Sequence, residues 1–199
     1  MNDLLAVDIV LLPPKDVLDK IISLIKYSSD SPIQLNSHDC LPHISLAMGV
    51  LSKTDLKKAK FALSSLADSQ KAFSITVTES STHTTPDGVE MRELLVVRSE
   101  ELLQLHQEAT DAFRLFLSHK DVRTGMFVAP PLVAEISTYW VKHYYDKQGP
   151  ADYKPHITLG VGTVEKLNTQ LHFSAERLAL CHLGTYCTCR QILLETVLR

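Results

Sequence analysis

The sequence predicts an α+β fold built mainly on antiparallel sheets. Segments with strand patterning and segments with helical patterning mix without the regular strand–helix–strand alternation of a parallel sheet. Apolar residues make up 45% of the 199 residues and charged residues 22%, which is a globular composition. No low-complexity linker divides the chain, so we expect a single domain over residues 1–199.

The first part of the chain indicates two strands and two helices. Residues 5–12 are apolar and rich in Val and Ile, which is typical of a buried strand. Between residues 15 and 27, apolar residues recur at helical spacing, and the polar residues 28–39 predict a loop. Residues 41–51 predict a second strand. Residues 52–69 begin with Ser-x-x-Asp, a helix-capping pattern, and predict a helix.

The middle of the chain indicates a hairpin followed by a helix. Residues 73–78 alternate apolar and polar side chains, as a half-buried strand does, and 91–98 is the expected partner strand. Residues 86–88, Pro-Asp-Gly, mark a turn. Ser99 is placed to cap a helix whose apolar face runs to Phe116, and two glutamates in its first turn favour the helix dipole.

The last part indicates one helix and three strands. After a loop at residues 121–131, the aromatic segment 134–145 predicts a helix. Residues 154–161 predict a strand. Residues 178–183 and 190–198 predict two more strands around a turn that contains a glycine.

Charge, targeting signals and cysteines narrow the possible classes. The net charge is −3, whereas proteins that grip long nucleic acids are usually basic. The apolar run at residues 9–12 is far shorter than the roughly 20 residues of a membrane span, and the N-terminus lacks a basic signal region. We therefore expect a cytoplasmic protein without a membrane partner. Cys40, Cys181, Cys187 and Cys189 form no CxxC pair, so reduced thiols are expected.

An internal repeat carries the functional signal. Residues 42–49 read PHISLAMG and residues 155–162 read PHITLGVG. The His-x-Ser/Thr core alone is weak evidence, because it also occurs at His83 and His172. Only the first two copies share the flanking Pro, Ile, Leu and Gly. The repeat therefore suggests two related halves, each with a similar strand.

The spacing of the repeat predicts a shared cleft. Residues two apart in a strand point to the same side, so His43 points with Ser45 and His156 with Thr158. If a pseudo-two-fold axis relates the halves, two imidazoles and two hydroxyls converge. Imidazoles can act as general base and general acid near neutral pH, and hydroxyls can donate hydrogen bonds to phosphate oxygens. This set suits a phosphodiester and requires no metal.

The paired motifs resemble those of the 2H phosphoesterase superfamily, which includes LigT-like 2′-5′ RNA ligases and cyclic phosphodiesterases. The strand that ends in Leu-Gly-Thr-Tyr at 183–186 is also similar to that family. The resemblance implies a bilobal fold with two pseudo-symmetric antiparallel sheets lining a central cleft and helices outside. It implies His43 and His156 as the acid/base pair and Ser45 and Thr158 as phosphate ligands, with no cofactor. The first motif has Ser where many members have Thr, but the hydroxyl is kept.

We expect from these observations a metal-independent phosphodiesterase that acts on a nucleotide or a short RNA. The bond could be a 2′,3′-cyclic phosphate, a 2′-5′ or 3′-5′ linkage, or a cyclic nucleotide. Two alternatives stay open: a nucleotide- or RNA-binding module without turnover, and an RNA 2′-5′ ligase. The charge of −3 weighs against a long RNA track. A monomer is expected, since the repeat supplies both halves of the site.

Several other residues carry weaker signals for a part in this site. Tyr153 is placed to reach the cleft mouth, where its ring could stack on a base. His83 is expected in a solvated loop, with a place in the cleft lining as the alternative, because hairpin loops often line a cleft. His106 and His172 are expected to be structural. Residues 38–43 include two histidines, an aspartate and a cysteine, but they lack the second cluster of a zinc site. Candidate phosphate contacts are Arg92, Arg123 and Lys154, and loops expected around the cleft are 28–39, 80–90 and 121–131.

Overall fold

The computed structural model describes residues 3–128, 133–165, 167 and 169–199. The strands in this part of the chain are β1 (Leu4–Leu12), β2 (Ile25–Tyr27), β3 (Ile44–Ser52), β4 (Phe73–Thr84), β5 (Glu90–Val96), β6 (His156–Gly160), β7 (Gly162–Val164), β8 (Leu171–Ala175), β9 (Arg177–Leu183) and β10 (Cys189–Val197). The helices are α1 (Lys15–Ser23), α2 (Leu56–Ser69), α3 (Glu100–Phe113) and α4 (Glu135–Lys147), with 3-10 turns η1 (Lys53–Asp55), η2 (Thr124–Met126) and η3 (Thr185–Cys187).

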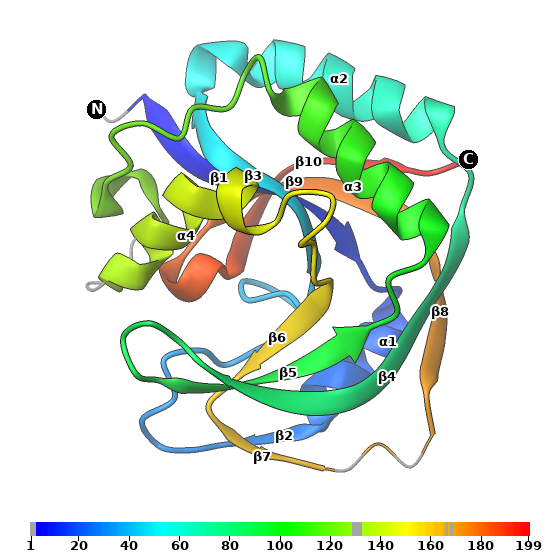
Figure 1. Ribbon diagram of the computed structural model, residues 1–199, viewed down its shortest axis with the longest axis vertical. Coiled ribbons are helices and arrows are strands. Elements are labelled where there is room, and N and C mark those ends of the chain that lie inside the picture. Colours follow the sequence, from blue (N-terminus) through cyan, green and yellow to red (C-terminus); the bar gives the residue numbers. More distant parts are fainter. Residues whose placement is uncertain (1–2, 129–132, 166, 168) are drawn as a thin grey trace.

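Two four-stranded sheets form the frame of the fold (Figure 1). Their strand orders are β10-β9-β1-β3 and β6-β5-β4-β8, and β2 pairs with β7 in a small third sheet. Every strand pair in the described part of the chain is antiparallel, which confirms the predicted α+β fold class. The strand β3, which carries the first motif, and β6, which carries the second, are both sheet edges.

Helices cover the outer side of the first sheet. Figure 1 shows α2 and α3 side by side above this sheet, with the second sheet on its opposite side. Apolar residues of α2 and α3, such as Leu63 and Phe113, belong to the same core cluster as residues of both sheets. Burial of one such side chain stabilises a fold by about 1.5–3 kcal/mol. No helix in the described ranges is both long enough and apolar enough to pass through a membrane.

Most element boundaries match the expectations, and the capping residues explain where two helical segments begin. The hydroxyl of Ser99 accepts from the backbone N–H of Leu102, as an N-cap does. The hydroxyl of Ser52 accepts from the N–H of Thr54 and opens the 3-10 turn that leads into α2. The helix expected to reach Phe116 ends at Phe113.

Two further boundaries shift, and one unpredicted strand appears, because strand pairing outweighs the local pattern. The first helix ends at Ser23 rather than at residue 27, since Ile25 pairs with Val164 of β7. Strand β4 continues to Thr84 instead of ending near residue 78, because its polar second half is hydrogen-bonded to β5. Strand β8 was not predicted; it pairs with the first half of β4.

The expectation that every cysteine is reduced is wrong for one pair. Cys181 on β9 and Cys189 on β10 form a disulfide that joins neighbouring strands of one hairpin. Cys187 lies in the turn η3 at the tip of that hairpin. Cys40 and Cys187 are buried free thiols.

Candidate active site

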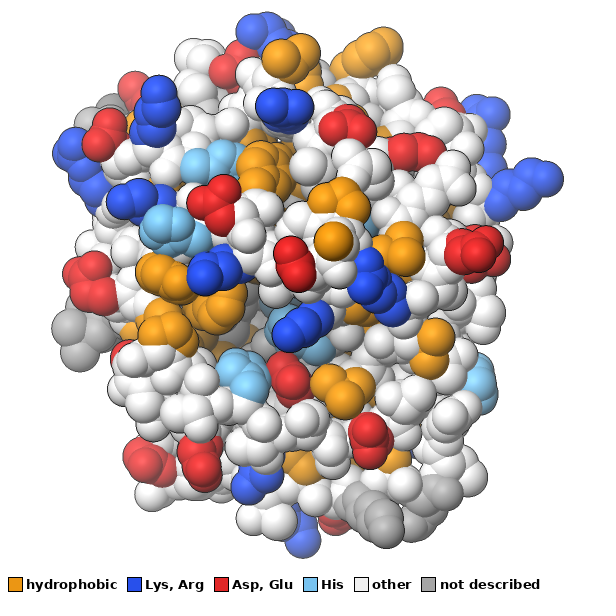
Figure 2. Space-filling view, viewed as in Figure 1, with side chains coloured by type: hydrophobic (Ala, Val, Ile, Leu, Met, Phe, Trp, Pro, Cys, Tyr) orange, Lys and Arg blue, Asp and Glu red, His pale blue; other side chains and the backbone are white. Residues whose placement is uncertain are grey.

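A cavity of about 590 Å³ is lined by residues of both four-stranded sheets. His43 and Ser45 of the first motif and His156 and Thr158 of the second motif all belong to its lining. In Figure 2, histidine and carboxylate side chains gather around a hollow near the centre of the face shown. The structure therefore brings the four predicted residues to one cavity.

His43 is held by a hydrogen bond to the backbone two residues before it. Its Nδ1 lies 2.9 Å from the carbonyl oxygen of Leu41, and because a carbonyl only accepts, Nδ1 carries the proton. Leu41 is itself anchored, since its N–H donates to the carbonyl of Cys189. The lone pair of the neutral ring is then on Nε2. Burial, opposed in part by the Leu41 hydrogen bond, lowers the pKa of His43 to about 4.

His156 repeats this local geometry at the start of β6. Its Nδ1 lies 2.9 Å from the carbonyl oxygen of Lys154, again two residues earlier. In both motifs a proline stands between the histidine and the accepting residue, and proline has no N–H and a restricted φ. The His156 side chain is 34% exposed, whereas that of His43 is 11% exposed. The same motif thus presents two imidazoles in different environments.

Each of these histidines faces a carboxyl group that the sequence did not single out. Nε2 of His43 lies 3.9 Å from Oδ2 of Asp8 on β1, and Nε2 of His156 lies 4.0 Å from Oε2 of Glu93 on β5. Asp8 is fully buried, and burial raises its pKa well above the usual range. The sequence does carry a signal for Asp8, because it is the one acidic residue inside the apolar run 5–12.

His83 lies in a strand and not in the expected solvated loop, and it lines the cavity, which was the alternative expectation for it. It lies in β4 opposite Met91, and its Nδ1 lies 3.0 Å from Oε2 of Glu93. The centres of the His83 and His156 rings are 6.4 Å apart. Burial alone would raise the pKa of Glu93, but contact with His83 and the charges of His156, His83 and Lys154 lower it.

Tyr153 is a buried residue of the cavity lining and does not lie at the cavity mouth as expected. Only 2% of it is exposed, and its ring stacks on that of His106 with centres 3.8 Å apart. Its hydroxyl donates to the carbonyl of Ser45 at 2.8 Å. His106 is a core residue, as predicted, with Nδ1 at 2.7 Å from the carbonyl of Leu46. The stacked pair therefore supports the backbone of the first motif.

The remaining candidates separate clearly. His172 is absent from the cavity lining and contacts the hydroxyl of Thr76 at 3.0 Å, in agreement with a structural place. Of the three candidate cations, Lys154 alone is among the described residues of the lining. Arg98, which was not a candidate, also belongs to the lining. Among the residues that the structure describes, no group of three or more His, Cys, Asp or Glu could hold a metal ion.

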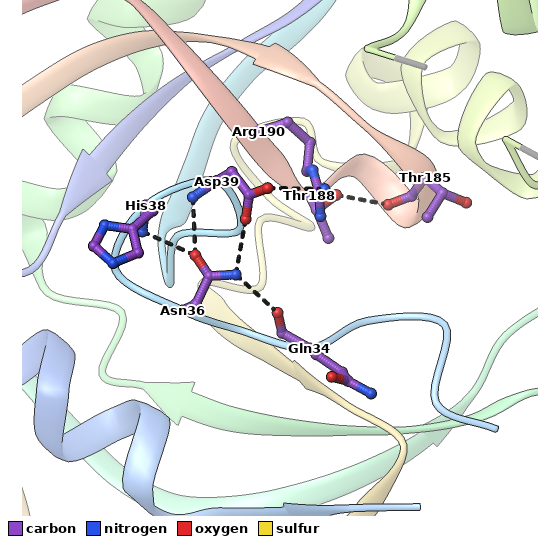
Figure 3. Close-up of polar contacts among 7 residues, drawn as sticks. All are labelled: Gln34, Asn36, His38, Asp39, Thr185, Thr188 and Arg190. Atoms are coloured by element: carbon purple, nitrogen blue, oxygen red, sulfur yellow. Dashed lines mark hydrogen bonds and ion pairs between the residues drawn. The ribbon is translucent and has the colours of Figure 1, made fainter. Parts of the chain in front are cut away.

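The cavity rim is tied across the two sheets. The hydroxyl of Tyr186 in η3 donates to Oδ2 of Asp87 at the β4–β5 turn, 3.1 Å away. Figure 3 shows Asp39 accepting from Asn36 at 2.8 Å and from Arg190 at 3.3 Å, which ties loop 28–39 to the hairpin of β9 and β10.

Two of the three loops expected at the cleft contribute to its lining. Leu35 comes from loop 28–39, and His83 and Thr85 come from 80–90. The third, 121–131, has residues 129–131 outside the described part, and its residues 121–128 are absent from the lining.

Solved structures share this architecture at low sequence identity. A crystal structure of TT0787 of Thermus thermophilus is 15% identical, with a TM-score of 0.62 and 98% of each chain covered. A crystal structure of E. coli LigT complexed with NADP+ is 17% identical, with a TM-score of 0.56 and 98% of each chain covered. A third, named only as a phosphoesterase, is 15% identical, with a TM-score of 0.53 and the same coverage. By sequence, the chain matches no protein-family model and no curated protein.

Proposed function

The chain has the fold of E. coli LigT, and from this fold and its paired motifs we propose that it is a 2H phosphoesterase. In this proposal it is a metal-independent phosphodiesterase of a nucleotide or RNA phosphodiester. The observation that carries the proposal is that His43, Ser45, His156 and Thr158 line one cavity. Both imidazoles have Nδ1 committed to a carbonyl, which leaves Nε2 for a substrate.

This set of groups can move two protons around one phosphorus atom. One imidazole takes a proton from the nucleophile as the new P–O bond forms, and the other gives a proton to the departing ribose oxygen as the old P–O bond breaks. Ser45 and Thr158 donate hydrogen bonds to the non-bridging oxygens. With water as nucleophile, a 2′,3′-cyclic phosphate opens, and the family resemblance implies a 2′-phosphate product. With a neighbouring ribose hydroxyl, a linear linkage is cleaved to a cyclic phosphate.

The cavity supports a small nucleotide substrate. A volume of about 590 Å³ lies within the range of small-molecule sites. Apolar and aromatic residues such as Met91, Trp140 and Tyr186 line one part of it, and Lys154 and Arg98 supply positive charge. Structures of E. coli LigT complexed with 3′-AMP and with ATP support a nucleotide ligand for this fold.

Hydrolysis assays in EDTA test the proposal. The substrates are 2′,3′-cyclic mononucleotides, 2′-5′ and 3′-5′ oligonucleotides and cyclic dinucleotides. His43→Ala and His156→Ala are each expected to lower kcat about 10²- to 10⁴-fold. His172→Ala is the control, because His172 is absent from the cavity lining.

Turnover that needs an added divalent metal, or that survives both active-site substitutions, would contradict the proposed mechanism. Tight binding of these ligands without turnover would identify a binding module instead. Joining of two RNA ends would identify a ligase.

A further inference from the structure

The two carboxyl groups beside the motif histidines lie at similar distances from the rings but in different surroundings. Asp8 lies 3.9 Å from Nε2 of His43, and Glu93 lies 4.0 Å from Nε2 of His156. Both distances are too long for a hydrogen bond, so neither carboxyl occupies the nitrogen that a substrate must reach. Both are short enough for a charge on the carboxyl to act strongly on a charge on the ring. Each carboxyl can therefore influence the charge of its histidine without blocking it.

Asp8 lies in surroundings that oppose a negative charge. It is fully buried, and within the described chain neither of its carboxyl oxygens has a hydrogen-bond partner. The groups that face it from β3, α4 and η3 include Ser45, Tyr144 and Cys187, together with Tyr153 from the segment before β6. None of them is a cation, and burial raises the pKa of the tyrosines and of Cys187. The nearby Ser45 hydroxyl and backbone of β3 only partly oppose the rise that burial causes in the pKa of Asp8. The neutral acid is the stable form of Asp8 here.

Glu93 lies in surroundings that favour a negative charge. His83 on β4 has Nδ1 3.0 Å from its Oε2, and His156 and Lys154 act on it with positive charge. Its side chain is 14% exposed, so water also reaches it. The ionised carboxylate is the stable form of Glu93 here.

We propose that Asp8 and Glu93 are positioning residues that assign the two proton roles, with His43 as the general base and His156 as the general acid. A neutral Asp8 offers no charge to draw a proton onto His43, which stays free to accept one. The Glu93 carboxylate stabilises the imidazolium of His156, which then has a proton to give. The charge on His156 in turn opposes a second charge on His43, so the pair shares one proton. This inference rests on the proposed function.

The assignment sets the direction in which a substrate lies in the cavity. In hydrolysis, water approaches phosphorus from the side of His43 and gives its proton to Nε2. The departing oxygen lies on the side of His156 and receives the proton from Nε2 there. After one turnover His43 holds the proton and His156 lacks one. Both rings have exposed surface, so exchange with solvent restores the starting state.

NMR titration tests the charge assignment whether or not the activity assays detect turnover. With ¹³C-labelled aspartate carboxyls, the Asp8 signal is expected to stay that of a protonated acid at pH 7. In protein with ¹⁵N-labelled histidine, Glu93→Gln is expected to lower the pH midpoint of the His156 signal by about one pH unit relative to Glu90→Gln. Glu90 lies on the same strand and is exposed, so it is a matched control. An ionised Asp8 at pH 7, or an unmoved His156 midpoint, would overturn the assignment.

Kinetics give the second measurement. Glu93→Gln is expected to lower kcat/KM about tenfold at pH 8 relative to Glu90→Gln, with little change at pH 6. The reason is that only the basic limb of the pH profile of kcat/KM moves. Asp8→Asn keeps a neutral group at this position, so the acid limb of the pH profile of kcat/KM is expected to stay in place. Asp3→Asn, on the exposed end of the same segment, is the matched control and is expected to behave alike. An acid limb that moves down in Asp8→Asn alone would overturn the role of Asp8. A wild type without turnover would refute the proposed function, while the NMR titration would still decide the charges.

Discussion

Lowering the pH is expected to destabilise the folded protein through His43. Burial lowers the pKa of this residue from 6.5 to about 4 in the folded protein. Between these values the unfolded chain binds a proton that the folded protein does not. The contribution of neutral His43 to stability is therefore complete above pH 6.5 and is lost as the pH falls toward 4. At 1.36 kcal/mol for each pH unit, the loss amounts to about 3 kcal/mol at pH 4.

The perturbation that isolates this effect is His43→Gln, since glutamine does not titrate. Urea unfolding of wild type and variant at pH 7, 6, 5 and 4 provides the free energy of unfolding at each pH. The wild-type value minus the variant value is expected to fall by about 2 kcal/mol by pH 5 and about 3 kcal/mol by pH 4. Groups that titrate alike in both proteins, such as Glu93, cancel in this difference. His172→Gln, on the exposed part of β8 and outside the cavity lining, is the control for the loss of a histidine.

Two outcomes would refute the reasoning. A difference that stays constant across the pH range would mean that His43 titrates alike in the folded and unfolded chain. A difference that grows as the pH falls would mean that the folded protein holds His43 charged, which requires an ionised Asp8 beside it. The second outcome would also contradict the proton roles proposed above.

Two further predictions concern the backbone around the motifs. Tyr153→Phe removes the hydroxyl that donates to the carbonyl of Ser45. It is expected to lower the free energy of unfolding in urea by about 1 kcal/mol. An unchanged free energy would show that the carbonyl finds another donor. Gly160→Ala is expected to lower stability by about 1–3 kcal/mol in thermal unfolding, because Gly160 has φ +119° and a Cβ there would lie 2.9 Å from the carbonyl oxygen of Ile33. An unchanged Tm would contradict that account.

The sequence was informative wherever function and local geometry depend on the same short segment. The order Pro-His-Ile-Ser/Thr-Leu places the histidine and the hydroxyl on one side of a strand and the apolar residues on the other. Ile44 and Leu46 are accordingly buried in the core, while His43 and Ser45 line the cavity. The period of two in a strand is enough for this prediction.

The sequence could not place the groups that reach the cavity through strand register. Glu93 arrives beside His156 because β5 pairs with β6, and His83 arrives because β4 continues its pairing with β5. Asp8 is placed by β1, next to β3. These registers depend on residues far apart in the chain. Tyr153 was misplaced for a similar reason, since its stacking partner His106 lies in α3.

The position of both motif strands at sheet edges has a consequence for solubility. The free edge of a sheet carries unpaired backbone groups to which a strand of another molecule can add. In the two four-stranded sheets, residues of β3 and β6 line the cavity, and the edge of β3 is partly paired, because Val50 and Ser118 exchange backbone hydrogen bonds. The outer edges are β8, which has five residues, and β10, which carries the charged Arg190 and Glu195. Short length in β8 and charge in β10 both discourage the addition of a strand from another molecule.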